Sequence, residues 1–114
     1  GREKEYQQEW HQSHRAQNNA RSRERHRRLK LEMIANYGGN CACCKEVRPE
    51  FLSLDHINGG GVAHRREVGT GSKMYYWLKK SGWPHGFRIL CYNCNLSLGH
   101  HGYCPHQEVG NAAA

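Results

Sequence analysis

Two cysteine pairs with the same spacing constrain this chain more than any other feature. The sequences "CACC" and "CYNC" each place two cysteines three positions apart, as Cys41 and Cys44 and as Cys91 and Cys94. Four thiolates in two such pairs are typical of a closed tetrahedral zinc site. Residues 45–90 separate the pairs, which is more than a simple zinc ribbon contains, so a complete folding unit must lie between them.

A metal site would matter for stability because the chain is short and polar. Its 114 residues predict one domain, and only 37% of them are hydrophobic. Domains of this size often depend on a bound metal or a disulfide, because their core is limited. No apolar stretch is long enough for a signal peptide or a membrane span. We therefore interpret the cysteines as reduced zinc ligands and expect no membrane partner. The chain begins with Gly rather than Met, so we expect it to be a piece of a longer protein.

The net charge predicts an anionic partner. The chain carries +7 at neutral pH, with an isoelectric point of about 9.3. A small protein this basic most often binds nucleic acid, although a basic surface that only keeps the protein soluble is the alternative. Residues 1–36 hold nine basic and five acidic side chains, and so contribute +4 of the total.

Residues 1–36 are predicted to form a basic helical arm, because they are rich in helix formers and contain no Pro. Between Trp10 and Leu29 the only apolar residues are two alanines, so this part of the helix has no stripe that could face a core. Its basic side chains recur on two helical faces, one with Arg21, Arg25 and Arg28 and the other with Arg23, Arg27 and Lys30. The pattern suits a helix that follows a phosphate backbone, and the alternative is a solvated arm without a specific role.

The end of the predicted helix differs from its middle. Leu29, Met33, Ile34 and Tyr37 are spaced to pack on a following domain. The sequence "YGGN" then ends the helix.

Residues 37–110 are predicted to form a small α+β domain, followed by a tail at 111–114. Residues 51–57 and 87–91 have the pattern of strands, and residues 72–82 that of a short helix with Met74, Trp77 and Leu78 on its inner side. Another short helix begins at residue 92.

The residues between the cysteine pairs carry the chemistry. The sequence "LDHINGGG" puts Asp55 beside His56 at the end of the first strand. Carboxylate oxygen is a preferred ligand of Mg²⁺ and Mn²⁺, and imidazole is suited to accept a proton near neutral pH. Adjacent strand residues point to opposite faces, but because this strand is ending, both side chains could reach one cleft.

Four segments together resemble a known family. "YGGNCACC", "FLSLDHINGGG", "GFRILCYNCNLSLG" and "GYCPH" are similar to the HNH endonucleases, also called His-Me finger or ββα-metal nucleases. The resemblance is to the zinc-stabilised subgroup that includes phage endonuclease VII and many phage- and intron-encoded HNH proteins. It covers residues 37–106, and its Asp-His and Cys-x-x-Cys-Asn elements are the specific ones.

The resemblance implies a ββα-metal fold and a role for each matching residue. Asp55 and Asn95 would bind one catalytic Mg²⁺ or Mn²⁺ ion, and His56 would be the general base that activates water. The two cysteine pairs would hold structural zinc. The products of DNA hydrolysis would carry 5′-phosphate and 3′-hydroxyl ends. A cytoplasmic protein of a bacterium or of a phage-infected cell is implied.

One element of the family pattern is missing. HNH proteins carry a middle Asn about five residues before the second cysteine pair, and that position lies near Gly86 in this chain. The group that orients His56 is therefore left open between a backbone carbonyl and Asn93.

Further basic residues are predicted to contact DNA. The segment "NGGGVAHRR" is interpreted as a loop that brings His64, Arg65 and Arg66 to the scissile phosphate, with a surface histidine as the alternative for His64. Lys79 and Lys80 are predicted to contact phosphates without sequence preference. The aromatic residues Tyr75, Tyr76, Trp77 and Trp83 are expected in the core rather than stacked on bases.

Cys43, Cys104 and His106 remain without a role. They could form a second zinc site together with His100 or His101. The interpretation favoured by the sequence is that Cys43 is an ordinary knuckle residue and that "GYCPH" packs against the first site.

Two other functions compete with a nuclease. One is a non-catalytic zinc-stabilised module that binds DNA or RNA, and the other is a structural domain of a larger assembly. The sequence leaves open the target site, nicking against double-strand cutting, homodimer formation, and a role in homing, restriction, packaging or junction resolution.

Overall fold

A computed structural model describes residues 2–107, and the side chains from residue 7 onward. Its elements, in chain order, are α1 (Arg2–Asn36), a short 3₁₀ helix η1 (Pro49–Phe51), β1 (Leu52–His56), α2 (Gly61–Val68), α3 (Ser72–Lys80), β2 (Phe87–Cys91) and α4 (Tyr92–His101). The fold is a small α+β arrangement around one two-stranded sheet, as the sequence predicts at that level. The end of the predicted domain at 108–110 and the tail at 111–114 lie outside the described residues.

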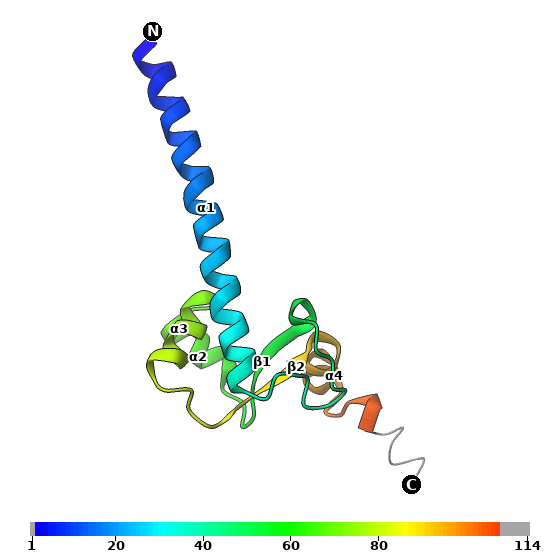
Figure 1. Ribbon diagram of the computed structural model, residues 1–114. Coiled ribbons are helices and arrows are strands. Elements are labelled where there is room, and N and C mark those ends of the chain that lie inside the picture. Colours follow the sequence, from blue (N-terminus) through cyan, green and yellow to red (C-terminus); the bar gives the residue numbers. More distant parts are fainter. Residues whose placement is uncertain (1, 108–114) are drawn as a thin grey trace.

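The first helix projects from the rest of the molecule (Figure 1). Helix α1 is 35 residues long, and the molecule measures 74 × 28 × 24 Å. All side chains from residue 7 to residue 25 are exposed. We call residues 2–28 the projecting arm and residues 29–107 the compact part. From residue 7 to residue 25 the arm is helical without packing against a core, as its polar sequence predicts, whereas His26 contacts Ser72 of α3 at 2.9 Å.

The last turns of α1 belong to the compact part. Leu29, Met33 and Ile34 are buried, with exposed fractions of 8%, 0% and 5%. This part of the helix packs on α3. Tyr37 donates a hydrogen bond from its hydroxyl to the carbonyl of Pro84 at 2.8 Å, which joins the end of α1 to the segment before β2. The predicted docking of these residues is confirmed.

Strands β1 and β2 form an antiparallel pair in which Leu52 lies opposite Cys91 and His56 lies opposite Phe87. Both strands fall within one residue of the predicted ranges. Leu52 and Ile89 are completely buried, in the same core as residues of α1 and α3. Helix α4 follows β2 without a loop and contacts both strands. The sheet therefore has side chains packed on it from two directions.

Helix α2 corrects one prediction. The sequence predicts a loop over residues 58–66, but residues 61–68 form a regular helix between two glycine-containing turns. Gly59 and Gly60 have φ angles of 77° and 81°, which glycine adopts without strain. These two residues end the strand, and the following residues are free to continue as a helix. Three glycines in a row indicated a longer break than the chain contains.

The aromatic residues of α3 divide between core and surface. Met74 and Leu78 are buried, and Tyr75 and Trp77 pack against the core, as does Trp83 beyond the helix. Tyr76 is 57% exposed, so the expectation that it belongs to the core is wrong. Tyr75 and Trp77, on either side of Tyr76 in the helix, pack against the core, and the side chain of Tyr76 points away from it to solvent.

Candidate metal centre and candidate active site

The two cysteine pairs meet at one end of the sheet. The sulfur atoms of Cys41, Cys44, Cys91 and Cys94 all lie within 4.8 Å of one another. All six cysteines of the chain are free thiols. Four converging sulfur atoms are the donor set of a structural zinc ion, so the residues fit the metal that their spacing predicts.

Local backbone structure prepares each pair. The backbone N–H of Cys44 donates to the sulfur of Cys41, and the N–H of Cys94 donates to the sulfur of Cys91, both at 3.4 Å. The first pair lies in a tight turn in which Lys45 has a positive φ angle of 71°. The second pair bridges the last residue of β2 and the first turn of α4. A bound ion would thus hold the start of α4 against the turn that follows α1.

The thiols of this cluster have shifted pKa values. Burial raises the pKa of Cys41, but hydrogen bonds from the backbone N–H groups of Cys44, Cys91 and Cys43 outweigh it and lower that pKa to about 6. Burial, followed by hydrogen bonds with neighbouring thiols, raises the pKa of Cys94. Crowded buried thiols therefore resist losing all their protons together. A bound divalent cation reverses this preference, because a coordinating thiol is deprotonated.

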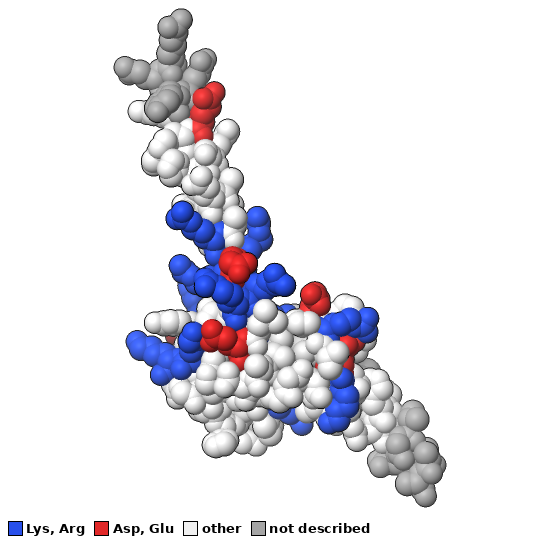
Figure 2. All heavy atoms as spheres, viewed as in Figure 1, with Lys and Arg blue, Asp and Glu red and all other residues white. Residues whose placement is uncertain are grey.

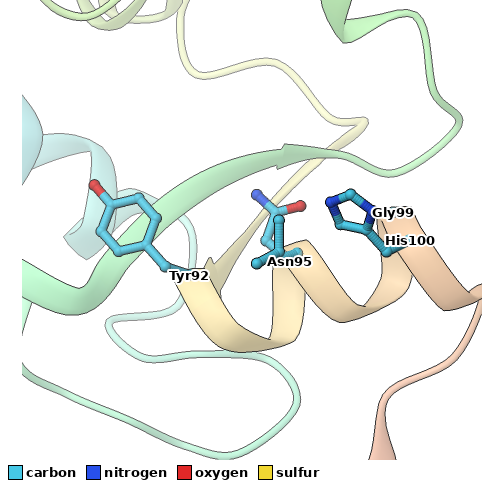
Figure 3. Close-up of a pocket in the computed structure, with 5 residues that line it drawn as sticks. Tyr92, Asn95, Gly99 and His100 are labelled. Atoms are coloured by element: carbon cyan, nitrogen blue, oxygen red, sulfur yellow. The ribbon is translucent and has the colours of Figure 1, made fainter.

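Asn95 follows the cluster directly and points at the sheet. Its side-chain amide donates from Nδ2 to Ser53 Oγ at 3.0 Å, and Ser53 Oγ donates to the carbonyl of Leu90. Figure 3 shows the Asn95 side chain extending from α4 toward β1. Because alternate strand residues share a face, Asp55 lies on the same face as Ser53. The two predicted ligands of the catalytic ion, Asp55 and Asn95, thus belong to one face of the sheet.

Asp55 has a partner that the sequence analysis missed. Arg88 donates from Nε to Asp55 Oδ2 at 2.8 Å, and the two residues lie opposite each other in the sheet. The Asp55 side chain is 20% exposed. Within residues 2–107, the other carboxylate oxygen of Asp55 makes no hydrogen bond. Pairing the two predicted strands in register would have revealed Arg88.

His56 lies on the opposite face from Asp55. It is the last residue of β1 and still paired with β2, so its ring packs edge-on against Phe87 at 4.9 Å between ring centroids. Asp55 and His56 therefore point to opposite faces of β1. The strand does not turn both side chains into one cleft, as the sequence analysis expects. Burial, followed by the positive charges of His64 and Arg65, lowers the pKa of His56.

His64 of α2 is the group that orients His56. The two rings are joined by a hydrogen bond of 2.8 Å between His56 Nε2 and His64 Nδ1. His64 also packs edge-on against Trp77 at 4.4 Å between centroids. Its Nε2 atom is buried and has no hydrogen-bond partner among the described residues. His64 is therefore not a surface histidine. It is also the group in contact with the His56 ring, although the sequence predicts that His64 contacts DNA.

Gly61 lies beside the other nitrogen of His56. A methyl group built on Gly61 would lie 3.2 Å from His56 Nδ1 and 3.0 Å from Arg65 Nη1. Glycine at position 61 therefore lets the His56 ring and the Arg65 guanidinium lie close to the start of α2. Arg65 and Arg66 are both exposed on α2, in agreement with the predicted phosphate contacts, which stay predictions.

A hollow adjoins Asn95. It has a volume of about 600 Å³ and is lined by Tyr92, Asn95, Leu96, Gly99 and His100. Figure 3 shows His100 on the same side of α4 as Asn95, with both side chains directed toward the strand. These residues recur at helical spacing, so the sequence alone could indicate that they share one side of the helix that begins at residue 92.

Basic side chains gather where the projecting arm enters the compact part (Figure 2). Arg21, Arg25 and Arg28 are exposed, and the contact of Arg28 with Glu24 is long, at 4.0 Å. Lys80 is exposed as well. Lys79 instead forms an ion pair with Glu32 of α1 at 2.9 Å, so part of its charge is already compensated. No helix among residues 2–107 is long and apolar enough to cross a membrane.

A second group of metal-binding side chains lies beside the first. The ligand atoms of Cys43, Cys94, Cys104 and His106 are also within 4.8 Å of one another. The less favoured interpretation of the sequence therefore gains support, with one correction: the fourth member is Cys94 and neither His100 nor His101. Packing of residues 103–106 against the first cluster accounts for the burial of Cys104, which is 3% exposed.

Comparisons of the chain with protein-family models, with curated proteins and with solved structures found no match.

Proposed function

We propose that this chain is a metal-dependent DNA endonuclease of the HNH type. The observation that carries the proposal is that Asp55 and Asn95 belong to one face of the β1–β2 sheet, where Asn95 is bonded to Ser53, two residues before Asp55 in β1. The cysteine cluster supports this arrangement because it lies immediately before Asn95 and holds the first turn of α4. A non-catalytic module would not require a carboxylate and an amide oxygen on the same face.

Asp55 and Asn95 would hold the catalytic cation through oxygen atoms. Asn95 uses its amide nitrogen to donate to Ser53, which leaves its carbonyl oxygen for a cation. One oxygen of Asp55 is bonded to Arg88, and the other is not engaged within residues 2–107. Mg²⁺ or Mn²⁺ bound there would neutralise negative charge on a phosphate oxygen.

His56 would act as general base through Nδ1. Its Nε2 is already bonded to His64, so Nδ1, which lies close to Gly61, is the nitrogen that remains for water. In the proposed step His56 takes a proton from water, and the water oxygen forms a bond to phosphorus. The bond between phosphorus and the 3′ oxygen breaks, and that oxygen takes a proton from solvent water and ends as a hydroxyl. The 5′-phosphate stays on the other product.

Two arginines would complete the electrostatics of the reaction. Arg65 and His56 Nδ1 both lie close to Gly61, and Arg88 is bonded to Asp55. Each arginine is therefore near one of the two proposed functional groups, which lie on opposite faces of β1. Positive charges placed in advance stabilise the additional negative charge of the transition state. His64 would act as a positioning residue, since it touches His56 and its remaining nitrogen is buried.

The substrate class follows from the charge. The exposed arginines of the projecting arm and of α2 offer cationic groups that suit a polyanion of regular spacing, and DNA is the one that the resemblance implies. The second candidate is a zinc-stabilised module that binds nucleic acid without cutting it. The basic arm supports this candidate equally well, because the arm has no contact with Asp55 or His56.

A plasmid assay separates the two functions. Zinc-loaded protein is incubated with supercoiled plasmid in Mg²⁺, in Mn²⁺ or without an added divalent cation, and nicked and linear products are quantified. We expect cleavage that requires the added cation. His56→Ala should lower the rate by about 10²–10⁴-fold, because a general base contributes that much.

Two exposed neighbours provide matched controls. His85→Ala removes a histidine outside the site, and Asn93→Ala removes an amide from the same knuckle as Asn95. Both should cleave normally, whereas Asn95→Ala should not. Binding of DNA without any cleavage across the metal series would replace the nuclease with the binding module. Full activity of His56→Ala would overturn the assignment of His56 as the general base.

A further inference from the structure

We infer that the cysteine cluster is binuclear, with a second zinc ion bound by Cys43, Cys94, Cys104 and His106 and with the sulfur of Cys94 shared between both ions. The inference does not depend on nuclease activity. It rests on two overlapping groups of ligand atoms, each of which is compact and each of which contains Cys94.

The distances in the second group suit one ion. Bonds of about 2.3 Å to sulfur and about 2.0 Å to nitrogen, at tetrahedral angles, separate neighbouring ligand atoms by roughly 3.5–3.8 Å. His106 Nδ1 lies 3.1 Å from Cys104 Sγ, 3.3 Å from Cys94 Sγ and 3.9 Å from Cys43 Sγ. The observed distances fall on both sides of the ideal value, so small side-chain rotations would complete the coordination.

The ligands come from three separate parts of the chain. Cys43 lies in the turn after α1, Cys94 lies in α4, and Cys104 and His106 lie beyond α4. Their convergence is not a local consequence of sequence spacing, because 63 residues separate Cys43 from His106. Three sulfur atoms and an imidazole meeting at one point have little to offer one another by packing alone, whereas they are a common zinc donor set.

Cys94 is suited to bind two ions. The sulfurs of Cys41 and Cys91 each accept a backbone N–H, at 3.4 Å. Among the described residues, the sulfur of Cys94 accepts no backbone N–H, and it contacts His106 Nδ1 at 3.3 Å as well as thiols of both groups. A thiolate has enough lone pairs for two cations, and Cys94, which is fully buried, lies between the two groups.

The charge of the pair of ions is acceptable. A zinc ion with four thiolates carries a formal charge of about −2. The second ion adds two positive charges, and its additional ligands are two thiolates and a neutral imidazole. The second ion therefore brings no further net charge into the cluster. It would also join the segment after α4, where Cys104 is 3% exposed, to the turn after α1.

The number of bound ions tests the inference directly. We expect native mass spectrometry of zinc-loaded protein to show two zinc ions per chain, one for each group of ligands. Cys104→Ser and His106→Ala should each retain one ion. His101→Ala, which removes a nearby exposed histidine outside both groups, should retain two. A single ion in the unchanged protein would overturn the second site.

The shared sulfur has its own readout. Protein loaded with ¹¹³Cd should give two cadmium resonances that are split by scalar coupling through the sulfur of Cys94. Two resonances without mutual coupling would overturn the sharing of Cys94. Both measurements use the unchanged chain, so they decide the question even where a variant fails to fold.

Discussion

The projecting arm and the compact part of this molecule reach order in opposite ways. The arm is helical because of its residue types alone: from residue 7 to residue 25 every side chain is exposed. The compact part consists of short helices and two short strands, and six cysteines and a histidine converge within it. One region is ordered by local propensity and the other by contacts between distant residues. Substitutions should therefore have very different consequences in the two regions.

The difference also separates two aspects of DNA recognition. An exposed helix with basic side chains on several faces can bind phosphates without a defined geometry. Asp55, Asn95 and His56 can work together only if the strand and α4 keep their relative position. Affinity is thus expected to depend mainly on the arm, and chemistry on the integrity of the cysteine cluster.

Loss of the metal should produce the largest effect. Structural zinc contributes an apparent binding free energy of roughly 10–16 kcal/mol in small domains, and this is folding free energy. Cys41→Ser or exhaustive chelation should therefore unfold the compact part, with loss of the near-ultraviolet circular dichroism of Trp77 and Trp83. Helical signal from the arm should persist in part, because the arm does not touch the cluster.

Asn93→Ala is the matched control for metal loss. Asn93 lies between two ligands of the same knuckle, but it is exposed and contributes no ligand atom. It should leave zinc content and folding unchanged. A compact part that keeps its tertiary signal without metal would show that the hydrophobic core, and not the cluster, determines the fold.

A smaller effect should distinguish the buried and exposed faces of the last turns of α1. Met33 is completely buried, and Leu31, two residues earlier in the same helix, is 39% exposed. Met33→Ala should lower the free energy of unfolding by about 2–5 kcal/mol, because it leaves a cavity in the core. Leu31→Ala should change it by about 0.5 kcal/mol or less. Urea denaturation of zinc-saturated protein measures both, and equal losses would contradict the burial of one face of α1 in the core.

The sequence predicts local features of this molecule well and contacts between distant residues less well. The strands, α1, α3 and the first cysteine group follow from spacing and periodicity, which are local. Helix α2 was missed because it is eight residues long and follows three glycines, so propensity gave no clear signal. The bond between His56 and His64 depends on how that helix packs, and it was therefore out of reach.

The second cysteine group illustrates the same limit. Its four members were all recognised as possible ligands, but the sequence cannot show that Cys94 faces both groups. That property depends on where residues 103–106 pack after α4 ends at Gly102, which has a φ angle of 77°. The pairing of Asp55 with Arg88 needed only the register of two predicted strands and could have been found.

Changes in the arm should affect binding and spare stability. Replacing Arg21, Arg25 and Arg28 together with Ala should weaken DNA binding and reduce its salt dependence, by about 0.9 in the logarithmic slope for each phosphate that the variant no longer neutralises. The free energy of unfolding should hardly change, because all three side chains are exposed. The triple Arg→Lys variant keeps the charge and should keep the slope. An unchanged slope in the Ala variant, measured by fluorescence anisotropy, would leave the arm without a role in binding.

The smallest expected effect concerns pH, and it separates chemistry from binding. Burial and the charges of His64 and Arg65 lower the pKa of His56 from its usual value of 6.5. A general base works in its neutral form, so the cleavage rate should fall only as the pH drops below 6.5, whereas binding through arginines stays constant there. In Arg65→Ala a positive charge is removed, protonation of His56 becomes easier, and the acid limb of the rate profile should move to higher pH. Arg66→Ala removes an equal charge that does not act on His56, so it should leave the position of the limb unchanged. Equal shifts in both variants would mean that the limb reports the general charge of α2 and not the proton on His56.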